Sequence, residues 1–205
     1  MVKMMDKPKF FDYVRKSDLF KGKLNADQVE GIEAILDATK EAAWPLSWTA
    51  YALATAYHET AFTMQPIAEM GGHNYFETNY GVNGKNPKRA ILNGNTATGD
   101  GAKYKGRGFV QLTWKNNYKK AAIATGLPID VNPDLMLQIK PALKVMIWGM
   151  SGGHFTGKAL KDYLGSKGAF QDFVNARRII NGSDKAMEIA NYAFKFQTAL
   201  MLAGA

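Results

Sequence analysis

The chain contains no cysteine among its 205 residues, which excludes a disulfide framework and any thiol nucleophile. Histidine is also scarce: there are three, at positions 58, 73 and 154, and no His-Glu-x-x-His pattern. We therefore expect neither a metal site nor an organic cofactor. No segment reaches the roughly 18 to 20 apolar residues of a membrane span, so we expect no stable membrane insertion.

Acidic side chains are the minority among the charged ones. The chain has 18 Asp and Glu against 26 Lys and Arg, a formal net charge of +8 and a pI near 9.5. Such a protein is attracted to polyanions. The lysines are scattered, however, and no nucleic-acid-binding motif is present, so we expect no nucleic acid partner. A hydrophobic fraction of 46% is typical of a folded chain.

What the sequence does contain is a carboxylate at the end of an apolar, helix-like run. Residues 47–59 follow Pro45, lack internal Gly and Pro, and offer Ser47 as an N-cap, which predicts a helix ending at Glu59. On that helix Glu59 would lie on a mostly apolar stripe with Trp48, Ala52, Thr55 and Ala56. An apolar setting of this kind favours the protonated carboxyl that a general acid needs. We therefore take Glu59 as a candidate catalytic acid.

A second carboxylate, Glu69, follows ten residues after Glu59. Pro66 must interrupt any continuing helix, so Glu69 lies beyond a turn and can face Glu59 rather than follow it along one helix. Hydrolysis of a glycosidic bond uses one protonated and one ionised carboxylate in this relation. Glu77 is the alternative base. Glu69 is preferred because Glu77 lies beyond the Gly71-Gly72 pair, in a segment that we expect to be more mobile.

A polar and glycine-rich block lies further along the chain. Residues 104–118 carry the string Tyr-x-Gly-Arg-Gly-x-x-Gln-Leu-Thr-x-x-x-Asn-Tyr, and residues 179–182 read Ile-Ile-Asn-Gly. The glycines at 106 and 108 can adopt backbone conformations closed to other residues and can bring Arg107 close to a bound sugar. Together with His58-Glu59-Thr60, these blocks resemble glycoside hydrolase family 19, the chitinase-like enzymes that include bacteriophage endolysins. The resemblance covers roughly residues 45–200.

The resemblance implies roles for individual residues. Glu59 matches the general acid, and Thr113 matches the hydroxyl residue that helps to hold the attacking water. Plant members of the family place the base farther from the acid, so Glu69 is the less secure part of the match, with Glu77 as its alternative. Five further residues are expected to bind substrate: Gln111, Asn117, Asn181, Tyr104 and Arg107.

The sequence predicts a mainly α-helical, lysozyme-like fold with two lobes, a central substrate groove and long loops. Residues 1–205 would form a single catalytic domain with a smaller loop-rich lobe at about 61–105 and no separate wall-binding domain. We expect helices at 8–20, 26–42 (capped by Asn25), 47–59, 116–125, 141–150, 170–180 and 184–202. The many glycines between 71 and 105 predict loops around one short helix at 87–92.

The resemblance implies hydrolysis of β-1,4 bonds by the family's inverting acid/base mechanism, and we expect bacterial peptidoglycan as the substrate and lysis of the host cell as the result. The N-terminus lacks the apolar stretch of a secretory signal. We therefore expect a monomer made in the host cytoplasm and released to the wall by a separate membrane-permeabilising protein. The alternatives are a chitinase, a lytic transglycosylase and a non-catalytic wall-binding protein.

Overall fold

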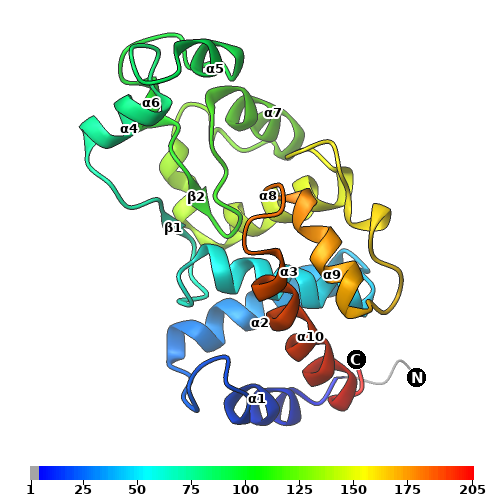
Figure 1. The fold of residues 1–205 in the computed structure, drawn as a ribbon. Coiled ribbons are helices and arrows are strands. Elements are labelled where there is room, and N and C mark those ends of the chain that lie inside the picture. The colour runs from blue at the N-terminus through cyan, green and yellow to red at the C-terminus, as the bar shows by residue number, and fades with distance from the viewer. Residues whose placement is uncertain (1–4) are drawn as a thin grey trace. The chain divides into compact units, whose positions relative to one another are not determined.

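A computed structural model describes residues 5–205 of the chain and divides them into two compact units. The first unit contains the described residues up to Met64 together with Gly149–Ala205, and the second contains Gln65–Trp148. The chain crosses between the units twice, after Met64 and after Trp148, and the second boundary falls within α8 (Ile139–Gly152). The prediction of a mainly α-helical protein is confirmed, because helices dominate both units (Figure 1). No helix among the described residues is long and apolar enough to cross a membrane.

The first unit is built around α3 (Leu46–Glu59), in which ten consecutive or near-consecutive residues are buried. A helix that is buried on all sides belongs in a core, and α3 packs mainly against α10 (Ala186–Leu202). The other elements of this unit are α1 (Lys7–Lys16), α2 (Ala26–Glu41), the 3₁₀ helix η2 (Leu160–Asp162), α9 (Phe170–Ala176) and the 3₁₀ helix η3 (Arg177–Ile179).

The ends of these helices test the capping predictions. Asn25 caps α2 as predicted, since its side chain accepts a hydrogen bond from the Gln28 backbone N–H at 2.8 Å. The prediction that Ser47 caps α3 is wrong. Pro45 holds the N-cap position without a side-chain hydrogen bond, and the Ser47 hydroxyl donates instead to the Gly165 carbonyl. A buried tertiary partner therefore replaces the local cap.

The second unit has short elements joined by long connections. A two-stranded antiparallel sheet pairs β1 (Ile67–Ala68) with β2 (Arg107–Gly108), in the register that sets Ala68 opposite Arg107. Its helices are α4 (His73–Tyr80), α5 (Pro87–Leu92), α6 (Asp100–Lys103) and α7 (Lys115–Thr125), followed by the 3₁₀ helix η1 (Pro133–Leu137). Helix α5 has the predicted bounds, and α7 ends at Gly126 in the left-handed conformation.

The prediction of loops on both sides of α5 is wrong in two places, because α4 and α6 form there. Helix α4 buries Phe76, which is 1% exposed, and α4 packs against α6. Tertiary packing thus overrides the weak helix propensity of a glycine-rich and asparagine-rich segment. Whether the loop-rich lobe ends at residue 105, and whether the whole chain acts as one catalytic domain, stay predictions.

Candidate active site

Glu59 is the last residue of α3, and its side chain is held by one buried cation. Its Oε1 accepts a hydrogen bond from Arg177 Nη1 at 2.7 Å. The Arg177 side chain is 2% exposed and that of Glu59 is 16% exposed. Arg177 is itself fixed, because its Nε donates to the Asp184 carbonyl at 2.9 Å. A charge-assisted bond of this length orients the carboxylate firmly.

The environment of Glu59 agrees with the expectation of an apolar stripe. Thr55 and Ala56, one turn earlier on α3, are both fully buried. Among the described residues, Arg177 is the hydrogen-bond partner of the Glu59 carboxylate and reaches only Oε1.

Arg177 is the residue beside Glu59 that the sequence did not indicate. It lies in the same block as Asn181, and the Asn181 backbone N–H donates to the Arg177 carbonyl at 2.9 Å. The Asn181 side chain is exposed in this turn. The signal that could have found Arg177 is its position: it lies two residues before the buried Ile179, in a segment already expected to line the site.

Glu69 belongs to the second unit and directly follows β1. The pairing of β1 with β2 extends one residue beyond Ala68 and Arg107, because the Glu69 backbone N–H donates to the Gly106 carbonyl at 2.8 Å. Its side chain accepts two hydrogen bonds: Oε1 from the Tyr80 hydroxyl at 2.8 Å and Oε2 from the Gly106 backbone N–H at 3.3 Å. The carboxylate is thus placed by neutral donors, in contrast to Glu59.

Tyr80 is a reliable donor in this arrangement. Burial, together with the hydrogen bond to Glu69, raises the pKa of the Tyr80 phenol above its ordinary value. The phenol therefore stays protonated at neutral pH and keeps donating to the carboxylate. Tyr80 ends α4, so the helix that the sequence did not predict is the element that delivers this donor.

The space beside Gly106 is where the predicted polar residues meet. A Cβ atom added at Gly106 would lie 3.3 Å from Glu69 Oε2, 3.3 Å from Thr113 Oγ1 and 2.8 Å from Gln111 Oε1. Three oxygens from three separate positions in the chain therefore surround one point. Glycine is required at 106 for space rather than for an unusual backbone angle, whereas Gly108, at φ +85°, has the left-handed conformation that the sequence suggested.

Gln111 and Thr113 are locked by their own hydrogen bonds. Gln111 has φ +51°, and its Nε2 donates to the carbonyls of Ile67 and Gly108, each at 3.1 Å. These bonds aim its Oε1 toward Gly106. The Thr113 hydroxyl donates to the Gln111 carbonyl at 2.9 Å. Its hydrogen is engaged in this bond, so the Thr113 oxygen acts toward other groups as an acceptor.

Glu77, the alternative base, has a different set of partners. Its Oε1 accepts from the Ala102 backbone N–H at 2.7 Å and its Oε2 from the Gly99 backbone N–H at 3.1 Å. Both oxygens thereby satisfy amides at the start of α6, where a helix has unpaired N–H groups and favours negative charge. This geometry gives Glu77 a structural task. The choice between the two bases stays a prediction, and the geometry favours Glu69.

Two of the residues expected to bind substrate are buried in the second unit. Arg107 donates from Nε to Asp134 at 2.8 Å and from Nη1 to the Lys103 carbonyl at 2.9 Å, among other bonds. The Tyr104 hydroxyl donates to the Asp130 carbonyl at 3.0 Å. Both side chains tie loops of their own unit together, so substrate binding by them stays a prediction that these contacts do not favour.

Asn117 is partly exposed on the first turn of α7. Its Nδ2 donates to the Thr113 carbonyl at 2.9 Å, which fixes the residue that precedes Trp114 and the start of the helix. Asn117 therefore supports the position of Thr113 directly. Among the described residues no cluster of His, Asp and Glu has the arrangement that could hold a metal ion.

Solved structures with the same fold are bacterial chitinases. Chitinase C from Streptomyces griseus HUT6037 is 21% identical, with a TM-score of 0.57, over 94% of this chain and 76% of that one. A chitinase C variant with one glutamate changed to glutamine gives 19% identity and a TM-score of 0.61 over 98% and 77% of the two chains. A bacterial family 19 chitinase is 20% identical, with a TM-score of 0.52, over 98% of this chain and 95% of that one.

No protein-family model and no curated protein sequence matches the chain. At about one-fifth identity, the structural likeness establishes the fold alone. The protein has a family 19 chitinase-like fold, mainly α-helical and of the lysozyme-like kind.

Proposed function

We propose that the protein is a glycoside hydrolase that uses Glu59 as general acid and Glu69 as general base. The observation that carries the proposal is the convergence beside Gly106, where Glu69 Oε2 and Thr113 Oγ1 each lie 3.3 Å from the position of a Cβ atom added at Gly106 and so border the same side of that residue. A carboxylate and a hydroxyl in this relation are suited to hold one water between them. The carboxylate accepts a hydrogen bond from one O–H group of that water and later its proton, and the threonine oxygen accepts a hydrogen bond from the other O–H group.

The acid half of the proposal rests on how Glu59 is held. Arg177 donates to Oε1, so we assign the proton to be transferred to Oε2. After transfer the Glu59 carboxylate is negative, and the buried guanidinium at 2.7 Å stabilises that charge. Arg177 is accordingly a positioning residue, which orients the acid and stabilises its conjugate base.

The reaction then proceeds as a single displacement. Glu59 gives its proton to the glycosidic oxygen as the bond from that oxygen to the anomeric carbon breaks. Glu69 takes a proton from the water, whose oxygen forms the new bond to the anomeric carbon from the opposite face. The sugar is released with inverted configuration, and proton exchange with solvent restores both carboxyl groups. Gln111 Oε1, which faces Gly106, is well placed to accept a hydrogen bond from substrate.

The proposed substrate is a β-1,4-linked polymer of N-acetylated amino sugars, with bacterial peptidoglycan preferred. The net charge of +8 supports this preference, because peptidoglycan and its attached wall polymers carry negative charge whereas chitin does not. The role we propose is that of a phage endolysin, monomeric and made in the host cytoplasm. It would reach the wall through the action of a separate membrane-permeabilising protein.

Chitin is the second candidate substrate, because the solved structures that share the fold are chitinases. Incubation of the protein with purified peptidoglycan and with chitin, followed by mass spectrometry of the fragments, separates the possibilities. A hydrated reducing end on peptidoglycan fragments is the expected result. An anhydro end would identify a lytic transglycosylase, fragments from chitin alone would identify a chitinase, and no fragments from either polymer would contradict the proposal.

A further inference from the structure

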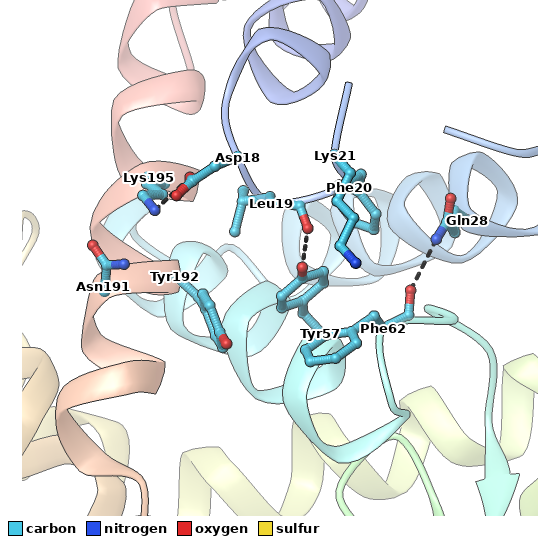
Figure 2. A pocket seen from close by; sticks show the side chains of 10 residues that line it. All are labelled: Asp18, Leu19, Phe20, Lys21, Gln28, Tyr57, Phe62, Asn191, Tyr192 and Lys195. Atoms are coloured by element: carbon cyan, nitrogen blue, oxygen red, sulfur yellow. Dashed lines mark hydrogen bonds and ion pairs between the residues drawn. The ribbon is translucent and has the colours of Figure 1, made fainter. Parts of the chain in front are cut away.

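The first unit contains a pocket of about 400 Å³ that the proposed catalytic residues do not line (Figure 2). It combines aromatic rings with amide side chains, contributed by the segment before α2, by α2 itself, by the end of α3 and by α10. The residues that matter for its chemistry are Phe20, Tyr57, Phe62, Tyr192, Gln28 and Asn191.

An aromatic surface forms one side of this pocket, with Tyr57 at its centre. The Tyr57 ring centroid lies 4.9 Å from that of Phe20, 4.7 Å from that of Phe62 and 4.8 Å from that of Tyr192. Phe62 is 45% exposed although it is one of the largest apolar residues of the unit. Phe20 and Tyr57 are buried, so the solvent-facing part of the cluster is the Phe62 ring together with the edge of Tyr192. An exposed aromatic ring that is backed by a packed aromatic cluster indicates a binding site more than a packing defect.

The exposed ring is held in place by the fold. The Phe62 backbone has φ +69°, a strained angle for a residue with a side chain, and its carbonyl accepts a hydrogen bond from Gln28 Nε2 at 3.0 Å. The Tyr57 hydroxyl donates to the Leu19 carbonyl, as the dashed line in Figure 2 shows. The aromatic surface is therefore preorganised, which reduces the entropy lost when a ligand binds.

Polar groups at the rim complete the pocket. Asn191 is exposed on α10, and its amide offers both a donor and an acceptor. Asp18 and Lys195 form an ion pair at 2.5 Å, and Lys21 adds an exposed ammonium group. Few polar groups around an apolar surface are the usual composition of a small-ligand site, and the volume is in the usual range.

We propose that this pocket is a second sugar-binding site, which takes an N-acetylated amino-sugar unit of the polymer on a face of α3 other than the one that carries Glu59. The choice of ligand class rests on the proposed function. The C–H face and acetyl methyl of such a sugar suit the aromatic surface, and its hydroxyl and amide groups suit Asn191. Tyr57 and Glu59 are two residues apart on α3 and so point to nearly opposite faces of the helix. The pocket is therefore separate from the acid.

A pelleting assay on insoluble peptidoglycan and insoluble chitin tests this site. All proteins carry Glu59→Gln so that the polymer is not degraded. Phe62→Ala should weaken binding about tenfold. Phe194→Ala is the matched control, because Phe194 is 46% exposed, lies on α10 and does not line the pocket. It should bind as the parent does.

A second variant guards against a folding artefact. Asn191→Ala changes an exposed helix position, so it should leave the melting temperature unchanged and weaken binding severalfold. Weaker binding of the Phe62 variant to both polymers identifies the shared amino sugar as the ligand. Weaker binding of the Phe62 variant to peptidoglycan alone would show that the pocket takes the carboxylate-bearing glycan strand of peptidoglycan and not chitin. Unchanged binding of both variants to both polymers would overturn the inference.

Hydrolysis measurements separate this inference from the proposed function. With Glu59 intact, Phe62→Ala should cleave a short soluble oligosaccharide within twofold of the wild-type rate. A loss of that activity equal to the loss of polymer binding would place Phe62 in the catalytic groove and overturn the separate site. If the wild-type protein cleaves nothing, the proposed function fails, whereas a binding difference between the Phe62 and Phe194 variants still supports the pocket.

Discussion

The two proposed catalytic carboxylates are held in opposite ways by the two units of the molecule. In the first unit, Glu59 is fixed by the buried guanidinium of Arg177 at 2.7 Å. In the second, Glu69 is fixed by neutral donors, the Tyr80 phenol at 2.8 Å and the Gly106 amide at 3.3 Å. A cationic partner suits a group that becomes negative during the reaction. Neutral donors orient a carboxylate without neutralising the charge that attracts a proton from water.

The contrast within the second unit is as informative. Glu69 and Glu77 each accept two hydrogen bonds, but those of Glu77 both come from the backbone at the start of α6. Glu69 instead points one oxygen to the space that Thr113 and Gln111 share. Two glutamates eight residues apart are thereby given different tasks. Hydrogen-bond partners, rather than residue type, distinguish a reactive carboxylate from a structural one.

The largest effect is expected from Glu59→Gln. It keeps the size of the side chain but removes the transferable proton, so kcat should fall on the order of a hundredfold or more. Circular dichroism should show an unchanged fold. Glu41→Gln is a matched control, because Glu41 is exposed and ends α2 as Glu59 ends α3. Wild-type lysis by a folded Glu59 variant would remove the acid from the mechanism.

Glu69→Gln should come next. We expect kcat to fall on the order of a hundredfold with KM little changed, because the lost interaction matters chiefly in the transition state. Glu77→Gln should leave kcat within a few-fold but lower the free energy of unfolding by about 1–3 kcal/mol, since the amides at the start of α6 lose a charged acceptor. Steady-state kinetics and denaturant unfolding on both variants check this. The reverse pattern would make Glu77 the base.

Gly106→Ala should reduce kcat about tenfold, a smaller effect than loss of either carboxylate. The new methyl group would lie 2.8 Å from Gln111 Oε1 and 3.3 Å from both Glu69 Oε2 and Thr113 Oγ1, so it would displace the oxygens that we expect to hold the water. Gly72→Ala is the control in the same unit, because a Cβ there meets no atom within 4 Å. Equal activity of the two variants would show that the space beside Gly106 is not used.

The smallest effect is expected from Thr113→Val, which preserves shape and removes the hydroxyl. Turnover should slow severalfold, on the order of one lost hydrogen bond of about 1 kcal/mol, with less change in KM. Thr113→Ser should retain most of the wild-type rate because it keeps the oxygen. A Val variant as fast as the Ser variant would make Thr113 purely structural.

Local signals in the sequence predicted much of the helical structure. Asn25, Pro87 and Gly126 each set a helix end through their own backbone or side-chain chemistry, and α2, α5 and α7 begin or end where they indicate. Glu59 at the end of α3 follows from an uninterrupted apolar run. Capping and turn chemistry are local, so one sequence is sufficient to read them.

Long-range partners could not be read in the same way. The cation that pairs with Glu59 lies 118 residues away, and the carboxylate that anchors α6 comes from α4, 25 residues before Ala102. Ser47 has the composition of a cap but finds a better partner at Gly165. Helix α4 forms because Phe76 is buried and Glu77 is bonded, which no periodicity in its polar sequence indicates. Packing decides these features, and it depends on the whole fold.

Chemical rescue tests the central claim most directly, namely that Glu69 activates the attacking water. Glu69→Ala and Glu77→Ala are each assayed on a soluble amino-sugar oligosaccharide with and without sodium azide. Azide needs no base and is small enough to enter the space left by the missing carboxylate. The account predicts that azide restores turnover only in the Glu69 variant and yields a glycosyl azide of inverted configuration, identified by NMR. Rescue of the Glu77 variant instead, or a product with retained configuration, would contradict it.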